Sequence, residues 1–284
     1  MTTCPICNKQ NNRKYLTAQN THGGTVINQL EKFIYNKCDN CDALFIPGIK
    51  INKEYYKKYY DKYTEGKANI HPLIASLNNY SIKKRESLIT KLIKKKKISI
   101  LDIGSGDCEF LLNISDQMFD KSGVEISTES NKIAEQKNIK IYNDDIFNIN
   151  FGNKKFDVIT LWHVIEHIEQ PSKLIAKLTK LLSKEGIICI STPNTNSYGF
   201  KYGNTDWFHL DAPRHLVLFN NKTIEIMAEL CLMKVIETKN ENYTFPTDLL
   251  RSIRNHSLKI LFYIFYPFLK YIDNEATIYV LKNK

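Results

Sequence analysis

The spacing of hydrophobic residues changes along the chain and predicts a regular domain in its last two thirds. From residue 98 onward, short apolar, β-branched runs are separated by stretches in which apolar residues recur with helical spacing. Such runs are typical of strands that are buried on both faces of a parallel sheet. The predicted strands cover residues 98–103, 122–126, 139–142, 156–161, 187–190, 233–239 and 276–281, and the predicted helices 127–137, 171–182 and 222–230. This alternation indicates an α/β fold with a doubly wound, mostly parallel seven-stranded sheet.

The first 97 residues lack this alternation and contain two cysteine pairs with identical spacing. The paired residues are Cys4, Cys7, Cys38 and Cys41. Two CxxC turns direct four thiolates at one point, which is the ligand set of a closed, structural Zn²⁺ site. We therefore expect a zinc ribbon over residues 1–50, with a turn at 22–24 and a strand pair within 26–35. Two unrelated turns or a redox-active cysteine pair are the alternative interpretations.

The other cysteines and the first residues bear on the compartment. Cys108, Cys189 and Cys231 stand singly in apolar surroundings, so the seven cysteines do not form the even set of a disulfide framework. The chain starts without the basic and apolar segments that are typical of a secretory signal. We therefore expect a reducing, cytoplasmic location.

The positive charge of the chain is concentrated in its first third. Lysine and arginine outnumber aspartate and glutamate by 40 to 30, and residues 1–97 alone carry 19 cations and 7 anions. Eight of these cations lie in 83–97, near the end of a helix predicted over 73–93. That helix belongs to a basic helical linker or cap that we expect over 51–97. Such a segment attracts phosphate groups on an acceptor or on RNA, but a solvated helix face explains it equally well.

A glycine turn joins the first predicted strand of the regular domain to a helix. Gly104 and Gly106 follow the strand 98–103 directly, and the chain has only 11 glycines. Glycine lets the backbone approach a ligand, and a helix N-terminus offers unpaired N–H groups. Glu125 ends the second strand about 20 residues later, where a carboxylate can accept hydrogen bonds from both ribose hydroxyls. A nicotinamide fingerprint would need a glycine at Glu109, so the turn predicts a nucleotide site of another kind.

Five motifs in sequence order make residues 98–240 and the last strand resemble the class I S-adenosylmethionine-dependent methyltransferases. The motifs are LDIGSGDCEFL, GVEIS, NDDIF, FDVITLWHVIEHIEQP and ISTPN. One departure is Cys108, where the family usually has a third glycine. The resemblance implies a methyltransferase domain over 98–284 with S-adenosylmethionine as its cofactor. The cofactor-binding residues that it implies are Asp102, Gly104, Ser105, Gly106, Glu125, Ile126, Asp145, Ile146 and Trp162.

The resemblance also assigns these residues to parts of the cofactor. Asp102 and the two glycines would line the methionine end, Glu125 would hold the ribose, and Asp145 with Ile146 would flank the adenine. The fourth motif contains an HxxEH pattern that also matches a class of zinc peptidases. Its position after a buried strand of a nucleotide-binding sheet favours the methyltransferase interpretation.

An insert at 194–219 interrupts the alternation, and it is expected to lie over the carboxyl ends of the strands, where ligand crevices form. It resembles the acceptor-binding insert of zinc-ribbon methyltransferases that modify sugars and surface glycans. The resemblance implies O-methylation of a small glycosyl acceptor, nucleotide-linked or lipid-linked and therefore phosphate-bearing, with a histidine as general base. The candidate bases are His215, His163 and His209, and the candidate acceptor-binding residues are Trp207, Arg214 and Tyr198. A structural role for each histidine, and an ion pair of Arg214 with Asp206 or Asp211, are the alternatives.

Two other functions stay open at this point. A ribosomal-RNA base methyltransferase with an RNA-binding zinc ribbon would explain the basic first third, and a non-catalytic scaffold would explain the fold without chemistry. A second insert at 243–274 contains the apolar segment 258–272, which we interpret as a lid, a dimer face, a peripheral membrane contact or a packed helix. This segment is too short to span a bilayer, and the number of subunits is left open.

Overall fold

The computed structural model describes residues 2–22, 25–59, 72–127, 139–241 and 275–284, and the single residues 134, 137, 260 and 264. The predicted helix 127–137, the turn 22–24 and the apolar segment 258–272 fall largely outside these residues, as does most of the insert 243–274. Among the described helices, none is long and apolar enough to cross a membrane.

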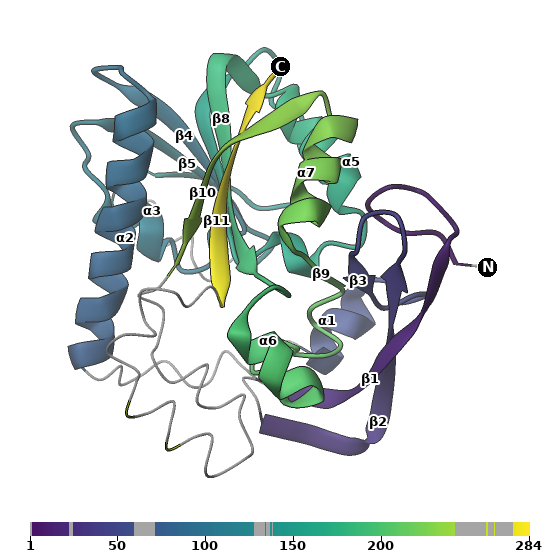
Figure 1. Cartoon of the computed structure of the whole chain (residues 1–284). Helices are drawn as coiled ribbons and strands as arrows, with labels where there is room; N and C mark the ends of the chain where they lie inside the picture. Colours follow the sequence, from purple (N-terminus) through teal and green to yellow (C-terminus); the bar gives the residue numbers. More distant parts are fainter. Residues whose placement is uncertain are drawn as a thin grey trace.

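A seven-stranded sheet forms the centre of the molecule (Figure 1). In sheet order its strands are β10 (Met233–Asn240), β11 (Ala276–Asn283), β8 (Leu182–Pro193), β7 (Phe156–Trp162), β4 (Ile98–Ile103), β5 (Phe119–Val124) and β6 (Lys140–Tyr142). β11 runs antiparallel to both of its neighbours, and all other adjacent pairs are parallel. The apolar runs of the sequence therefore form a doubly wound, mostly parallel sheet, and the predicted fold class is confirmed.

Helices cover both faces of this sheet, which explains why its central strands are mostly apolar on both faces. The covering helices are α2 (Pro72–Leu92) and α3 (Glu109–Asn113) on one face and α5 (Pro171–Thr179) and α7 (Asn221–Leu230) on the other (Figure 1). Along β4, Ile98 and Ile100 pack in the core that contains α2 and α3 residues, while Leu101 and Ile103 pack in the core that contains α5 and α7 residues. Burial on both faces removes the alternation of polar and apolar positions.

A second sheet joins the N-terminal segment to the insert. Its strands, all antiparallel, are β1 (Asn12–His22), β2 (Thr25–Cys38), β3 (Leu44–Phe45) and β9 (Val217–Leu218). The predicted strand pair within 26–35 is wrong, because β2 is one strand through this range and its partner is β1. β9 belongs to the insert 194–219, so the first 50 residues and the insert share one sheet.

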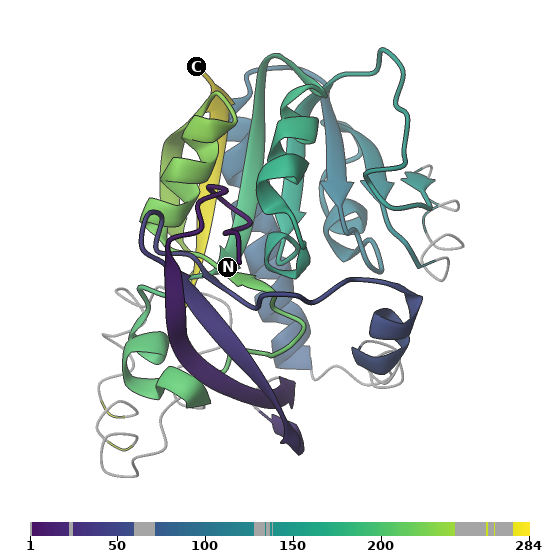
Figure 2. The same ribbon diagram turned by 90° about the vertical axis from the view of Figure 1, so that its right-hand side faces the viewer.

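The N-terminal segment lies against the α5 and α7 layer and toward the carboxyl ends of the parallel strands. Figure 2 shows the β1–β2 hairpin crossing below these two helices, with α1 (Lys53–Tyr59) at the same end of the sheet. Ser172 Oγ of α5 donates to Ile6 O at 2.8 Å, and Thr223 Oγ1 of α7 donates to Cys41 O at 2.8 Å. These contacts fix the cysteine-bearing segment on the central domain.

Tyr35 of β2 ties the hairpin to the insert. Its buried hydroxyl donates to His215 O at 2.5 Å and to Leu210 O at 3.1 Å. We expect Tyr35→Phe to lower the free energy of unfolding by about 1–3 kcal/mol, because buried carbonyl oxygens lose their donor. Chemical denaturation measures this change, and Tyr15→Phe is the matched control because its ring is exposed. Equal effects of the two substitutions would contradict the expectation.

Candidate active site

The turn between β4 and α3 is shaped by two glycines with left-handed backbone. Gly104 has φ +64° and Gly106 has φ +51°. A Cβ on Gly104 would lie 2.7 Å from Val164 Cγ2, so a larger residue does not fit there. The N–H groups of Gly104 and Ser105 donate to Val124 O at 2.8 and 3.1 Å. The turn is thus held at the ends of β4 and β5, the edge at which open parallel sheets bind ligands.

Cys108 completes the turn at the position of the family's third glycine. It is fully buried, and it adopts the left-handed conformation with φ 60° and ψ 19° immediately before α3. Left-handed backbone costs a residue with a side chain roughly 1–2 kcal/mol. Because Cys108 adopts this conformation despite the cost, the turn keeps its shape although a glycine is missing.

Glu125 lies at the mouth of this turn. β5 ends at Val124, and the Glu125 carboxylate accepts hydrogen bonds from Gly106 N at 2.8 Å and from Ser127 N at 2.9 Å. Both carboxylate oxygens are therefore fixed beside the glycines. The structure brings together the carboxylate predicted for a ribose and the glycines predicted for the methionine end.

Asp102 is the last polar residue of β4 and lies beneath the turn. Its side chain is 3% exposed, and Oδ1 accepts a hydrogen bond from Thr160 Oγ1 of β7 at 2.6 Å. Burial raises the pKa of this carboxyl to about 7, although the hydrogen bond from Thr160 opposes the shift. A cation that binds nearby would favour the ionised form.

If Asp102 lines the methionine end of the cofactor, as the family resemblance implies, the affinity for S-adenosylmethionine is expected to depend on pH. The Asp102 carboxyl is protonated below a pKa of about 7, so binding of an ammonium group beside it would then release a proton. The affinity should therefore rise with pH up to this value, by at most about tenfold per pH unit, and level off above it. Calorimetry on Asp102→Asn should give a flat profile, whereas the same slope in both proteins would assign the pH dependence to another group.

The remaining predicted cofactor residues differ in exposure. Ser105 and Ile146 are buried, while Ile126 is 51% exposed. Asp145 faces solvent after β6, and its Oδ1 accepts a hydrogen bond from Phe147 N at 2.8 Å. Ile126 and Asp145 thus lie on the loops that follow β5 and β6, at the same edge of the sheet as the glycine turn.

A chain of charged side chains, buried at Glu166 and Glu241 and partly exposed at His163, joins α2 to the end of β7. The Arg85 guanidinium lies 4.4 Å from the centre of the Trp162 ring, and Arg85 Nε donates to Glu241 Oε1 at 2.7 Å. Glu241 Oε2 lies 3.6 Å from His163 Nε2, and Glu166 Oε1 lies 3.4 Å from His163 Nδ1. Sequence reasoning misses Arg85 and Glu241 because they lie 156 residues apart and belong to no local motif.

His163 is held between two carboxylates in a strained backbone conformation. Its φ is +55°, which is uncommon for a residue with a side chain and is often found at functional sites. Burial alone would lower the pKa of His163, but Glu166 and Glu241 outweigh this and raise the pKa to about 9. The imidazole is therefore protonated at neutral pH, and it has no free electron pair with which to accept a proton.

The other two predicted bases lie together in the insert, beside a histidine of the fourth motif. His215 Nδ1 lies 2.7 Å from His209 O, and His167 Nδ1 lies 2.9 Å from Arg214 O. The rings of His167 and His215 pack edge to face with centroids 4.8 Å apart. Burial lowers the pKa of His209 to about 3 and that of His167 to about 4, so both rings are neutral.

The predicted acceptor-binding residues take three different positions. Trp207 is 2% exposed, and its indole N–H donates to Glu275 Oε2 at 2.6 Å. Arg214 pairs with Asp211, as one of the alternative interpretations expects. Tyr198 begins α6 (Tyr198–Gly203) and is partly exposed. Trp207 therefore supports the insert from inside, whereas Arg214 and Tyr198 lie nearer its surface.

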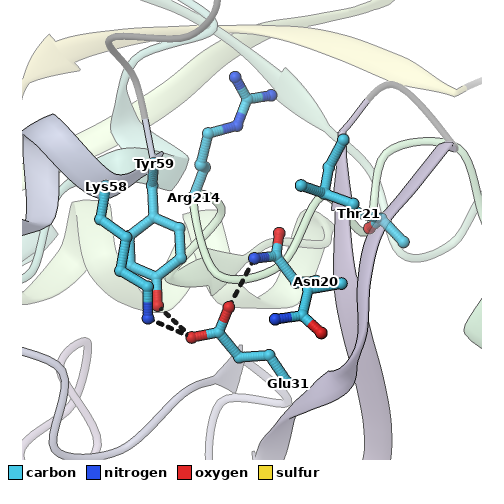
Figure 3. Close-up of a pocket in the computed structure, with 8 residues that line it drawn as sticks. Asn20, Thr21, Glu31, Lys58, Tyr59 and Arg214 are labelled. Atoms are coloured by element: carbon cyan, nitrogen blue, oxygen red, sulfur yellow. Dashed lines mark hydrogen bonds and ion pairs between the residues drawn. The ribbon is translucent and has the colours of Figure 1, made fainter.

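A cavity of about 220 Å³ lies between the hairpin, α1 and the insert (Figure 3). Its lining residues are Asn20, Thr21, Ile27, Asn28, Glu31, Lys58, Tyr59 and Arg214. The Glu31 carboxylate accepts hydrogen bonds from Asn20 Nδ2 at 2.7 Å, Lys58 Nζ at 2.5 Å and Tyr59 OH at 2.7 Å. The lining therefore combines hydrogen-bond donors and acceptors, and its charges largely compensate one another. Sequence reasoning finds only Arg214 among these residues.

The four paired cysteines meet at one point beside the first turn of the chain. Their sulfur atoms all lie within 4.8 Å of one another, with 3.6 Å between Cys4 and Cys41 and 3.5 Å between Cys7 and Cys38. All four side chains are buried. Sulfur atoms at about 2.3 Å from a tetrahedral Zn²⁺ are about 3.8 Å apart. The donor set and its spacing therefore fit a Zn²⁺ ion with no open coordination position.

The sheet order, the single antiparallel strand β11 and the glycine turn with its acidic neighbour define a class I S-adenosylmethionine-dependent methyltransferase domain. A family model described as a methyltransferase domain matches residues 77–230, more than half of the chain. The chain belongs to this methyltransferase family.

Curated relatives and solved structures agree with this assignment. The chain is 28% identical over 131 residues to a ubiquinone biosynthesis O-methyltransferase of Rickettsia bellii, covering 44% of this chain and 53% of the relative. It is 24% identical over 163 residues to the mitochondrial ubiquinone biosynthesis O-methyltransferase of Saccharomyces cerevisiae, covering 53% of this chain and 46% of the relative. The chain thus spans about half the length of these relatives.

Two solved structures share the fold. The plantazolicin methyltransferase BpumL, in complex with a pentazolic desmethylPZN analog and SAH, has a TM-score of 0.52 at 22% identity and covers 82% of this chain and 92% of its own. The PH0226 protein from Pyrococcus horikoshii has a TM-score of 0.51 at 16% identity and covers 84% of this chain and 100% of its own.

Proposed function

We propose that the protein transfers the methyl group of S-adenosylmethionine to a hydroxyl group of a small, sugar-type acceptor, nucleotide-linked or lipid-linked, in surface-polysaccharide biosynthesis. The observation that carries this proposal is the junction between the glycine turn and the insert. Val164 packs against Gly104, and three residues later His167 Nδ1 donates to Arg214 O at 2.9 Å. The segment after β7 therefore connects the donor side to the insert and to the cavity beside Arg214.

The donor side of the proposal rests on residues that share one edge of the sheet. Gly104 lets the turn pack against Val164, Gly106 leaves open space for the methionine part of the cofactor, Asp102 offers a buried carboxylate to its ammonium, and Glu125 faces the ribose. Bound S-adenosylmethionine supplies a methyl group on a sulfonium that is already a good leaving group. The protein must then align the acceptor oxygen with the methyl group and take up the hydroxyl proton.

The acceptor side rests on the polarity of the cavity. Amide, phenol, carboxylate and ammonium groups of Asn20, Tyr59, Glu31 and Lys58 line it, and such a mixture of donors and acceptors suits a hydroxyl-rich molecule. The name of the Rickettsia and yeast relatives, ubiquinone biosynthesis O-methyltransferase, indicates transfer to oxygen in those proteins. A hydroxyl acceptor in this protein agrees with that chemistry.

Of the three predicted bases, His215 remains the proposed proton acceptor. His163 is already protonated, and a pKa of about 3 makes His209 too weak a base. His215 donates its Nδ1 proton to a carbonyl oxygen, which leaves the electron pair on Nε2. His215 clusters with His167 and Glu166, and we assign the activation of the acceptor hydroxyl to this cluster.

The N-terminal part of the proposal is a structural zinc ribbon over residues 1–50. Cys4, Cys7, Cys38 and Cys41 would hold Zn²⁺ as thiolates. Because β3 follows this cluster directly and pairs with β9 of the insert, the ion would fix one wall of the acceptor side. No chemistry at the reacting methyl group is assigned to it.

Donor turnover with a panel of acceptors tests the proposed function. Purified protein is incubated with S-adenosylmethionine and either nucleotide sugars, lipid-linked sugars or an RNA fragment, and S-adenosylhomocysteine is quantified. We expect turnover with a member of the two sugar sets and none with RNA. Turnover that only RNA stimulates would replace this function with the RNA methyltransferase alternative. Glu125→Ala serves as the control with weakened donor binding.

A further inference from the structure

Two histidines and one glutamate converge next to the insert. One ligand atom from each of Glu166, His167 and His215 lies within 4.8 Å of the others. Glu166 and His167 follow β7, whereas His215 comes from the insert, so the fold assembles the cluster from two segments. Glu166 and His215 are buried, at 0% and 7% exposure.

Backbone carbonyl groups fix the orientation of both imidazole rings. His167 Nδ1 lies 2.9 Å from Arg214 O, and His215 Nδ1 lies 2.7 Å from His209 O. A carbonyl oxygen only accepts, so Nδ1 carries the proton in each neutral ring and Nε2 carries the electron pair. Metal-ligating histidines typically show this arrangement, in which the second nitrogen donates to a backbone carbonyl and orients the ring.

The two carboxylate oxygens of Glu166 differ in their hydrogen bonding. Oε2 accepts a hydrogen bond from Thr192 Oγ1 at 3.1 Å. Within the described part of the chain, the buried Oε1 accepts no hydrogen bond, and the protonated His163 faces it with Nδ1 at 3.4 Å. The charge of His163 compensates this oxygen at a distance, but a buried carboxylate oxygen without a hydrogen bond still has room for a ligand atom or an ion.

We propose that Glu166 and the Nε2 atoms of His167 and His215 form a binding site for a divalent transition-metal ion. Two imidazoles and one carboxylate are a ligand set that suits Mn²⁺, Fe²⁺ or Co²⁺ and leaves coordination positions open. Two ligands at about 2.1 Å from one ion are at most about 4.2 Å apart, so small side-chain rotations close the cluster around the ion. Asp211 Oδ2, 3.7 Å from His215 Nε2, is a further oxygen beside the site.

The consequence for catalysis rests on the proposed function. An ion at this site would offer its open positions to oxygen atoms of the acceptor and would lower the pKa of a hydroxyl bound to it. His215 would then be a ligand and not the proton acceptor. His215 therefore has two possible roles, proton acceptor or metal ligand, and a measurement of metal binding decides between them.

Titration with Mn²⁺ tests the site without any acceptor. One equivalent of Zn²⁺ per chain is added first, because four thiolates bind Zn²⁺ more tightly than two imidazoles and a carboxylate, so that the second site stays open to Mn²⁺. Electron paramagnetic resonance then measures the free Mn²⁺, and we expect one bound ion per chain. Loss of a ligand in Glu166→Gln or His215→Ala should weaken binding by about 100-fold or more, because even residues behind the ligands account for 10–100-fold.

The matched control is Glu185→Gln, which removes an exposed carboxylate that pairs with Lys282; it should bind Mn²⁺ like the wild type. In the wild type, Mn²⁺ should also broaden the imidazole resonances of His167 and His215 before those of other histidines, a result that does not depend on a variant's folding. An unchanged free Mn²⁺ signal, or equal binding by the Glu166→Gln and Glu185→Gln proteins, would overturn the proposal. Failure of methyl transfer in the acceptor screen would leave this result unaffected, so the two proposals fail separately.

Discussion

Removal of the proposed Zn²⁺ ion is expected to disorder the N-terminal sheet and to slow methyl transfer by about 100-fold, while S-adenosylmethionine still binds. A structural Zn²⁺ stabilises small domains by about 10–16 kcal/mol, far more than any single hydrogen bond that ties the first 50 residues to the rest of the chain. β3 lies three residues after Cys41 and carries β9 on its other edge. The disorder caused by loss of the metal should therefore extend to the insert, which contains His215 and Arg214.

Cys38→Ser is the variant that tests this prediction, and Cys231→Ser, at a buried cysteine outside the cluster, is its control. Metal analysis should find one Zn²⁺ per chain in the wild type and control. Amide exchange in β3 and β9 should become at least about 100-fold faster in Cys38→Ser, given the stabilisation expected from a structural zinc ion. Methyl transfer should fall by about 100-fold, the cost of misplacing a substrate by about 1 Å.

Calorimetry separates this effect from general unfolding. The donor edge of the sheet is formed by β4, β5 and β7, and none of them belongs to the N-terminal sheet. The affinity of Cys38→Ser for S-adenosylmethionine should therefore stay close to that of the wild type. A metal-free protein that keeps full methyl transfer would show that the ribbon is not needed for the acceptor side.

Glu125→Ala is expected to weaken the binding of S-adenosylmethionine by about 100-fold. Two hydrogen bonds from ribose hydroxyls to one carboxylate contribute about 3 kcal/mol together, and each 1.4 kcal/mol is about a factor of ten in affinity. The substitution also removes the acceptor of Gly106 N, so part of the loss will come from the turn itself. Equilibrium dialysis measures the affinity, with Glu185→Ala as a control on the surface.

A cofactor analogue separates the ribose contribution from the effect on the turn. S-adenosylhomocysteine without its ribose 2′-hydroxyl should bind the wild type at least about tenfold more weakly than the complete molecule, because one hydrogen bond to a charged group is lost. Glu125→Ala should bind both molecules equally. Equal binding of the two molecules by the wild type would show that Glu125 does not hold the ribose.

The sequence predicts the central sheet and the donor edge well because their signals are local. Most of the strands contain a short apolar run, and the glycine turn and Glu125 directly follow two of these runs. Asn220 is a further example of such a local feature, since it caps α7 with the hydrogen bond that its Oδ1 accepts from Thr223 N at 2.9 Å. Such features depend on neighbours in the chain.

The acceptor side resists prediction because it is built by contacts between distant segments. Nothing in the local sequence indicates that β9 pairs with β3 or that Arg85 pairs with Glu241. Trp207 is of a residue type that often binds ligands, but it is buried. Its indole N–H donates to Glu275, which lies 68 residues away in the sequence. A histidine's protonation likewise depends on such contacts, since two carboxylates from different segments keep His163 charged.

Transfer of an isotopically labelled methyl group tests the central claim most directly. The protein is incubated with S-adenosylmethionine that carries a deuterated methyl group and with the acceptor identified in the panel, and mass spectrometry with nuclear magnetic resonance locates the label. We predict the label on a hydroxyl oxygen of a small sugar-type acceptor. A label on carbon or nitrogen, or in RNA, would contradict this account.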